Sequence, residues 1–204
     1  IIQRSNGDVL LSSSLINQLN EHLEPEAIDL LVNIDTLPIA KTLSNVRQIH
    51  TFSYKEKNEN RFNQERKIIT KIYRKYDLSI NLTSSDRSVI YALLASKNAI
   101  SAVEKNNLKA WWKKIFLKHH FNYDLNSHIL INNLKPLKLL GLDTLSQQDP
   151  PKFSQVASVS VHDKLLKLKI TKFIIFHPSA QYKYKMYDKK LRDDLLYLLN
   201  TLNI

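Results

Sequence analysis

The chain has 204 residues, enough for one large domain or for one domain and part of a second. It contains no cysteine, which excludes disulfide scaffolds, thiolate zinc sites, iron–sulfur clusters and cysteine nucleophiles. Thirty Lys and Arg residues against nineteen Asp and Glu residues give a net charge of +11, which favours an anionic partner.

Glycine is unusually rare in this sequence. Ordinary usage of about 7% predicts roughly fourteen glycines, whereas the chain has 2, Gly7 and Gly141. So few glycines exclude the glycine-rich phosphate loops of dinucleotide-binding proteins and nucleoside triphosphatases. No run of about 18 apolar residues occurs, so the sequence predicts no membrane-spanning helix.

Short apolar runs alternate with helical patterns in the first part of the chain. In order, the pattern predicts the end of a strand over 1–4, a helix over 8–23, strands over 27–32 and 46–52, a helix over 61–75, a strand over 77–82, a helix over 85–96 and a strand over 99–103. Parallel strands need crossover connections, so this alternation predicts an α/β domain with a mostly parallel sheet and helices on both faces.

The same alternation continues beyond residue 106. It predicts helices over 107–118 and 127–140, a strand over 153–159, a helix over 161–169, a strand over 173–176 and a helix from about Asp188. Gly141 follows the second of these helices and is expected to supply a left-handed helix terminus.

The segment Asn6-Gly7-Asp8 lies between the first strand and the first helix. Ligands of open α/β sheets bind outside the carboxyl ends of the strands, where the strand order switches. We expect Gly7 to allow a sharp turn or a close approach of the backbone to a ligand. Asp8 could accept a proton from a substrate hydroxyl or cap the following helix, and position alone favours the cap.

Several segments carry a resemblance to glycosyltransferase family 9, the ADP-heptose:lipopolysaccharide heptosyltransferases. Ser5–Ile16 resembles the opening G-D-x-L-x-T-x-P-x-[LI] motif of that family. The likeness continues through Ala27–Val32, Tyr76–Thr83, Trp112–Lys114, Leu137–Asp143, Phe173–Ala180 and Lys185–Asp188. It covers nearly the whole chain in order, and it is greatest to the branch that adds the side-chain heptose of the inner core, heptosyltransferase III.

The resemblance implies a GT-B fold of two Rossmann-like domains, the first for the lipopolysaccharide acceptor and the second for ADP-heptose. It implies an acceptor-binding domain over 1–150, an interdomain segment over 151–172 and the start of the donor domain over 173–204. The family's later Asp…His-x-Ala segment is not in the sequence. We therefore expect the donor domain to be truncated here and the chain alone to be inactive. Tyr187 and Ser14 depart from the family's usual Trp and Pro.

The resemblance also implies the roles of particular residues. Asp8 would be the general base of an inverting transfer, and Lys185 would offset the charge on the departing ADP. Ser179 and Ala180 would form the turn that contacts phosphate. No metal or other cofactor is implied. Without the resemblance, Lys185 is a solvated lysine of a basic segment.

The resemblance further implies that basic residues of the first domain help to hold acceptor phosphates, a role that suits Arg and Lys clusters. The expected acceptor-binding residues are Gly7, Lys55, Lys57, Arg61, Arg87, Lys113 and Lys114. Interspersed glutamates leave open that the group from Lys55 to Arg61 is a solvated helix start. Arg87 follows Ser84 and Ser85, which could equally serve as helix caps.

The run from Lys109 to His120 mixes aromatic and basic side chains. Such a mixture could dock on membrane headgroups or on nucleic acid. Alternatively, Trp112, Ile115 and Phe116 form core while the lysines reach solvent. His119-His120 lacks a clear third ligand, so we expect no metal site there.

These patterns lead to one main hypothesis and two alternatives. The main one is an inverting heptosyltransferase of lipopolysaccharide inner-core assembly, in the bacterial cytoplasm and peripheral on the cytoplasmic face of the inner membrane. One alternative is a basic nucleic-acid-binding α/β domain without enzymatic activity, although no RRM, KH or helix-turn-helix signature occurs. The other is a truncated acceptor-binding fragment without turnover.

Overall fold

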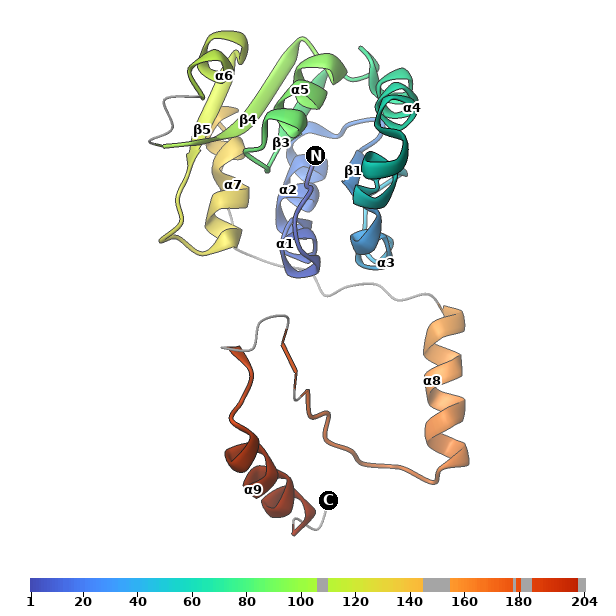
Figure 1. Cartoon of the computed structure of the whole chain (residues 1–204). Helices are drawn as coiled ribbons and strands as arrows, with labels where there is room; N and C mark the ends of the chain where they lie inside the picture. The colour runs from blue at the N-terminus through green and yellow to red at the C-terminus, as the bar shows by residue number, and fades with distance from the viewer. Residues whose placement is uncertain (106–109, 145–154, 178, 181–184, 202–204) are drawn as a thin grey trace. The chain divides into compact units, whose positions relative to one another are not determined.

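The computed structural model describes residues 1–105, 110–144, 155–177, 179–180 and 185–201 (Figure 1). The chain divides into two compact units, Ile1–Lys152 and Phe153–Ile204. The first unit holds the strands, and the second holds helices α8 (Gln155–Lys167) and α9 (Lys189–Asn200).

All strand pairs in the first unit are parallel. Strand β1 (Asp29–Asn33) pairs with β2 (Gln48–Phe52). Strand β4 (Asn98–Glu104) lies between β3 (Leu78–Asn81) and β5 (His119–Tyr123). The predicted α/β fold class with parallel strands is confirmed.

The segment Ile1–Gln3 joins these two groups of strands. Ile2 forms a parallel bridge with Val32 of β1. On its other side, the carbonyl of Ile1 accepts a hydrogen bond of 2.9 Å from the backbone N–H of Leu82, just after β3. The spatial order is therefore β2, β1, Ile1–Gln3, β3, β4, β5. This is the order of doubly wound nucleotide-binding folds, whose switch point lies beside the first strand in the chain.

Helices cover both faces of the strands. They are α1 (Asn6–Leu10), α2 (Ser13–Leu23), α3 (Leu37–Ala40) after a 3₁₀ turn at Ile34–Thr36, α4 (Tyr54–Ile72), α5 (Asp86–Ala95), α6 (Trp111–Phe116) and α7 (Ile129–Leu139). Successive strand residues face opposite sides, so Leu30 packs in one core with α2 and α7 while Leu31 packs in another with α4 and α5. Both faces are thus buried, as parallel sheets require.

Two helices of the first unit differ clearly from their predicted bounds. The helix predicted over 8–23 is two helices, because the Ser12 hydroxyl and backbone N–H both donate to the carbonyl of Val9 and end α1 there. Helix α4 begins at Tyr54, not at residue 61, since the Ser53 hydroxyl caps it by accepting from the N–H of Glu56. It bends at Asn60, whose φ of −151° is not helical.

The strands differ from the sequence-based prediction in three places. Strand β5 over His119–Tyr123 was not predicted at all. The strand predicted over 153–159 is wrong, because residues 155–159 lie in α8 and 153–154 fall outside the described residues. The apolar run 173–176 is irregular. A strand needs a neighbour for its backbone groups, and no described residue of the second unit is in a strand.

The two glycines have different backbone conformations. Gly141 has φ 72° just after α7, its N–H donates to Lys138, and the N–H of Leu142 reaches back to Leu137. The predicted left-handed helix terminus is confirmed. Gly7 lies inside α1 without a left-handed φ, so the predicted sharp turn there is wrong. An added Cβ at Gly7 would meet open space.

This contrast gives a matched pair of substitutions. Gly141→Ala should lower the free energy of unfolding by about 1–2 kcal/mol, because a Cβ clashes in the left-handed conformation. Gly7→Ala should be neutral or stabilise by up to about 1 kcal/mol, since alanine favours helix. Urea unfolding of both variants measures the difference, and equal effects would contradict the argument.

Candidate active site

Asp8 lies in the first turn of α1, which follows the carboxyl end of the segment Ile1–Gln3. Its backbone N–H donates to the Ser5 hydroxyl at 3.4 Å, and its Oδ2 accepts from the backbone N–H of Ser5 at 3.2 Å. This is a reciprocal capping box. The prediction that Asp8 caps the helix needs correction, because the cap is Ser5 and Asp8 completes the capping box as the third helical residue.

The carboxylate of Asp8 is also held by two side chains. Oδ2 accepts from the Ser5 hydroxyl at 2.9 Å and from the Arg4 guanidinium at 3.1 Å. That guanidinium lies 4.7 Å from the ring centroid of Tyr123 at the end of β5. Within the described part of the chain, Oδ1 receives no hydrogen bond. One oxygen thus orients the carboxylate, and the other remains able to accept a proton.

Arg87 lies in the first turn of α5, near the ends of three strands. Its guanidinium is 3.6 Å from the ring centroid of Phe52, the last residue of β2. It donates to the Tyr54 hydroxyl at 3.2 Å and to the Gln3 side-chain oxygen at 3.4 Å. Ser85 caps the same helix, as predicted. Arg87 is therefore at the carboxyl edge, where an open α/β sheet binds its ligand.

Lys113, predicted to bind the acceptor, is buried with 2% of its side chain exposed. Its ammonium is 2.8 Å from the carboxylate of Asp86 and 3.8 Å from that of Glu104. It also donates to the carbonyl of Ser84 at 2.5 Å. The charge of Lys113 is thus neutralised inside the protein, where it ties α6 to the start of α5. Lys114 is exposed.

The aromatic residues around Lys113 divide between core and surface. Trp112 is half-buried and packs against the cluster that contains Val89. Trp111, Ile115 and Phe116 are 65%, 67% and 66% exposed. The core interpretation is wrong for Ile115 and Phe116. The side of α6 that carries the buried Lys113 faces the core, and Ile115 and Phe116 lie on the side that faces solvent.

Other predicted site residues occupy two separate places. Lys55 and Arg61 are exposed and Lys57 is half-buried, on the part of α4 around its bend. The predicted donor-binding residues Ser179, Ala180 and Lys185 belong to the second unit. Their contacts with substrate stay predictions. Among the described residues, no three metal-ligating side chains gather into a candidate metal site.

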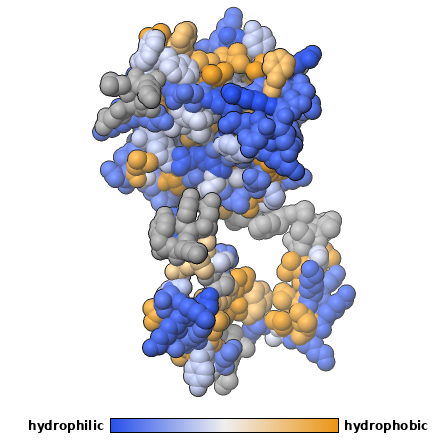
Figure 2. Space-filling view, viewed as in Figure 1, coloured by the Kyte–Doolittle hydropathy of each residue, from blue (hydrophilic) through white to orange (hydrophobic). Residues whose placement is uncertain are grey.

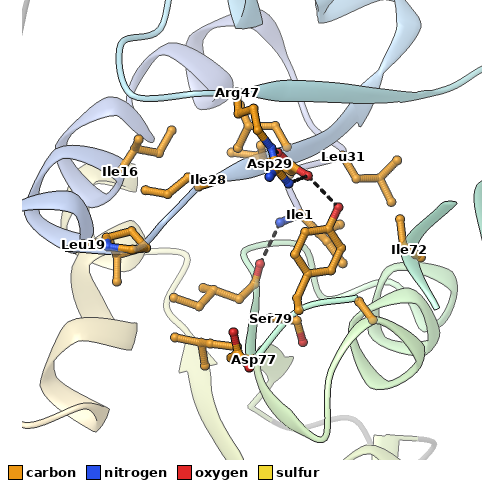
Figure 3. Close-up of a pocket in the computed structure, with 18 of the residues that line it drawn as sticks. Ile1, Ile16, Leu19, Ile28, Asp29, Leu31, Arg47, Ile72, Asp77 and Ser79 are labelled. Carbon is orange, nitrogen blue, oxygen red and sulfur yellow. Dashed lines mark hydrogen bonds and ion pairs between the residues drawn. The ribbon is translucent and has the colours of Figure 1, made fainter. Parts of the chain in front are cut away.

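A separate cavity of about 460 Å³ lies at the amino ends of β1 and β3 (Figure 3). At its edge, the Arg47 guanidinium donates to both oxygens of Asp29, at 3.0 and 2.8 Å. The Tyr76 hydroxyl donates to Asp29 at 2.9 Å and lies 3.1 Å from the ring nitrogen of His50. No pattern in the sequence indicates this cluster beyond the position of Asp29 at a strand start.

Asp29 and Arg47 are the two charged side chains of this cluster, and they form an ion pair with each other. Burial would raise the pKa of Asp29, but the hydrogen bonds from Arg47 and Tyr76 outweigh it and hold that pKa below its usual value. Burial lowers the pKa of His50. Burial, reinforced by Asp29, raises the pKa of Tyr76. Asp29 is therefore an ion-paired anion that joins β1 to neighbouring segments, at the opposite end of the sheet from Asp8.

Comparison with known proteins identifies relatives of the chain, although no family model matches it. It is 26% identical over 194 residues to lipopolysaccharide heptosyltransferase 3 of Escherichia coli, covering 91% of this chain and 55% of the relative. The protein of the same name from strain K12 is 24% identical over 191 residues, covering 91% and 54%.

Solved structures show the same fold. The glycosyltransferase family 9 protein of Veillonella parvula DSM 2008 matches 97% of this chain and 57% of its own, with a TM-score of 0.76. Escherichia coli heptosyltransferase WaaC with ADP matches 98% and 63%, with a TM-score of 0.73. Both are 14% identical to this chain. The resemblance to glycosyltransferase family 9 is confirmed. The chain spans about half the length of the curated relatives that it matches.

The Asp29 ion pair predicts how stability depends on pH. Because its pKa is depressed in the folded state, Asp29 stabilises the protein above its unfolded pKa of about 3.9, and this contribution is lost as the pH falls through the folded pKa. Asp29→Asn should lower the free energy of unfolding at pH 7 and reduce its loss between pH 7 and pH 3. Urea unfolding at both pH values tests this, with the exposed Asp35→Asn as a control that should leave the loss unchanged.

Proposed function

We propose that the chain is the acceptor-side part of an inverting heptosyltransferase that moves heptose from ADP-heptose to the inner core of lipopolysaccharide. The proposal rests on one observation. Hydrogen bonds to Oδ2 fix the carboxylate of Asp8 just after the carboxyl end of the segment Ile1–Gln3. The names of the curated relatives support the choice of sugar and acceptor. They also favour a transferase over a nucleic-acid-binding domain.

In the proposed reaction, Oδ1 of Asp8 takes the proton of an acceptor hydroxyl. The hydroxyl oxygen attacks the anomeric carbon of the heptose, and the bond from that carbon to the ADP oxygen breaks. ADP leaves with the bonding electrons, and attack from the opposite face inverts the configuration. Arg4 and Ser5 hold the base in a single orientation, which reduces the loss of freedom needed to reach the transition state.

Charge on the two substrates would be met by different residues. Lys185, Ser179 and Ala180 would offset the negative charge that grows on the departing ADP, so the proposal requires no metal. Arg87 and the basic residues of α4 would bind acceptor phosphates, for which the guanidinium fork is well suited. The open space beside Gly7 would let the acceptor approach the backbone.

We also propose that α6 rests on the cytoplasmic face of the inner membrane. Trp111, Ile115 and Phe116 are exposed on this short helix, with Lys114 and Lys118 exposed beside them. Figure 2 shows apolar side chains interspersed with hydrophilic ones over the upper end of the first unit, where α6 lies. Aromatic and basic side chains together suit an anionic headgroup layer. None of the described helices has the length and apolar character needed to cross a membrane.

Two variants separate catalysis by Asp8 from its capping role. Asp8→Asn keeps an oxygen that can accept the cap hydrogen bonds but cannot take a proton, so kcat should fall by about 10²–10⁴-fold with little change in stability. Ser5→Ala removes the cap and should cost about 1 kcal/mol of stability with a smaller loss of kcat. Transfer assays use an active form of the enzyme that carries residues 1–204. Near-normal turnover of Asp8→Asn would refute the assignment of the base.

Vesicle binding tests the α6 surface. Replacing Trp111, Ile115 and Phe116 together by serine should weaken binding to vesicles of phosphatidylcholine and phosphatidylglycerol by about tenfold or more. The matched control replaces Leu125 and Ile131, which are 89% and 54% exposed elsewhere, and should bind as the parent does. Co-sedimentation measures both, and equal losses in the two variants would contradict the proposal.

A further inference from the structure

The last residues of three neighbouring extended segments form a row at the carboxyl edge of the sheet. The bridge between Ile1–Gln3 and β1 places Gln3 level with Asn33. Asn33 in turn pairs with Phe52, at the end of β2. Residues at the same level of a parallel sheet share a face, and Phe52 packs with α4 and α5. The side chains of Gln3, Asn33 and Phe52 therefore lie side by side on the face that α4 and α5 cover.

The guanidinium of Arg87 spans this row. Its Nε donates to Oε1 of Gln3 at 3.4 Å, and its Cζ is 3.6 Å from the ring centroid of Phe52. Because Asn33 lies between these two residues, the guanidinium covers the Asn33 side chain. Nη2 donates to the Tyr54 hydroxyl at 3.2 Å. Within the described part of the chain, Nη1 donates no hydrogen bond.

Two amide atoms under Arg87 are buried and have no hydrogen-bond partner among the described residues. They are Nε2 of Gln3 and Oδ1 of Asn33. Gln3 as a whole is 6% exposed. The other atom of each amide is already engaged, since Oε1 of Gln3 accepts from Arg87 and Nδ2 of Asn33 donates to the carbonyl of Arg4 at 3.4 Å. One donor and one acceptor are therefore left over at adjacent positions.

The leftover pair has the chemistry to bind a hydroxyl group. An unpaired buried amide atom costs free energy, because it has lost its hydrogen bonds to water. A hydroxyl can accept from Nε2 of Gln3 and donate to Oδ1 of Asn33 with a single oxygen. A fully ionised oxygen could accept from Gln3, but it would be repelled by the Asn33 oxygen. The amide pair thus suits a sugar hydroxyl better than an anion.

Arg87 supplies the complementary preference for an anion. No carboxylate of the described residues forms an ion pair with it. Its hydrogen bonds to Gln3 and Tyr54 are long and go to neutral oxygens. An anion would compete well for the guanidinium, because hydrogen bonds between charged groups are about twice as strong as neutral ones. Movement of Arg87 toward an anion would uncover the amides of Gln3 and Asn33.

We propose that Arg87, Gln3 and Asn33 form one subsite for an anionic sugar of the acceptor. The guanidinium of Arg87 takes the anionic group, a phosphate or a carboxylate, and the uncovered amides of Gln3 and Asn33 take a neighbouring hydroxyl. The inference rests on the proposed function for the identity of the ligand as the acceptor. It adds that Gln3 and Asn33 discriminate between acceptors that carry this hydroxyl and acceptors that lack it.

Two substitutions of similar size at Gln3 test the subsite, in an active form of the enzyme that carries residues 1–204. Gln3→Met removes the amide donor, and Gln3→Glu replaces it with an oxygen that also pairs with Arg87. The dissociation constant of a phosphorylated lipopolysaccharide core oligosaccharide is measured by calorimetry without donor sugar. It should rise about tenfold in Gln3→Met and further in Gln3→Glu. Tm should not fall in either variant, because each loses an unpaired buried donor, whereas a merely structural role of Gln3 predicts a lower Tm and unchanged binding.

Asn133→Leu is the matched control. Nδ2 of Asn133 is likewise buried without a partner among the described residues, but its helix, α7, packs on the opposite face of the sheet. This variant should bind the oligosaccharide as the parent does. Removing the phosphates from the oligosaccharide identifies the anion. The difference between the parent and Gln3→Glu should disappear if the anion is a phosphate and persist if it is a carboxylate.

Two results would overturn the inference. One is an unchanged dissociation constant in both Gln3 variants, which would leave the amide pair of Gln3 and Asn33 to water alone. The other is an equal loss of binding in Asn133→Leu. Because binding is measured without ADP-heptose, a failure to transfer heptose would refute the proposed function without altering this readout.

Discussion

The structure depends on the hydrogen bonds that Ile1–Gln3 makes to both of its neighbours. Without this segment, β1 and β3 would be the edges of two unconnected groups of strands, and their inner backbone groups would have no partners. The same segment sets the strand order, and with it the switch point at which an α/β sheet binds ligand. Because only two residues, Arg4 and Ser5, separate the segment from α1, Asp8 is placed by the sheet itself.

Two ion pairs, each with one buried and one exposed partner, fix opposite ends of this sheet. Asp29 with Arg47 joins the amino ends of β1 and β2, and Lys113 with Asp86 joins α6 to the start of α5. Such pairs add little net stability, because desolvation offsets the attraction, but losing one partner leaves a buried charge and is costly. Their main effect is on how the helices and strands are arranged. The inward Lys113 orients α6 so that Trp111, Ile115 and Phe116 face solvent, which creates the surface proposed for the membrane.

The sequence was sufficient where local chemistry decides the structure. Alternating apolar residues predicted β2 and β3, and the single residue type suited to a left-handed terminus predicted the end of α7 at Gly141. The sequence was not sufficient where contacts between residues far apart in the chain decide the structure. The polar start of α4 lacks apolar residues at helical spacing, and no pattern in the sequence marks Ser53 as its cap. The run 173–176 has strand composition, but strand structure needs a neighbour. Lysine and aspartate patterns indicate surface, so the burial of Lys113 and Asp29 could not be predicted from them.

Capping by Asp8 is compatible with the catalytic role proposed for it, and the capping contacts would support that role. A carboxylate at an exposed helix start would sample several rotamers, and few of them would meet an acceptor hydroxyl. The bonds from Arg4 and Ser5 all end on Oδ2, so they restrain the side chain without occupying Oδ1. A general base gains from such restraint, because the freedom is lost on folding and not during the reaction. The capping box is therefore what would orient Oδ1 for the proposed proton transfer.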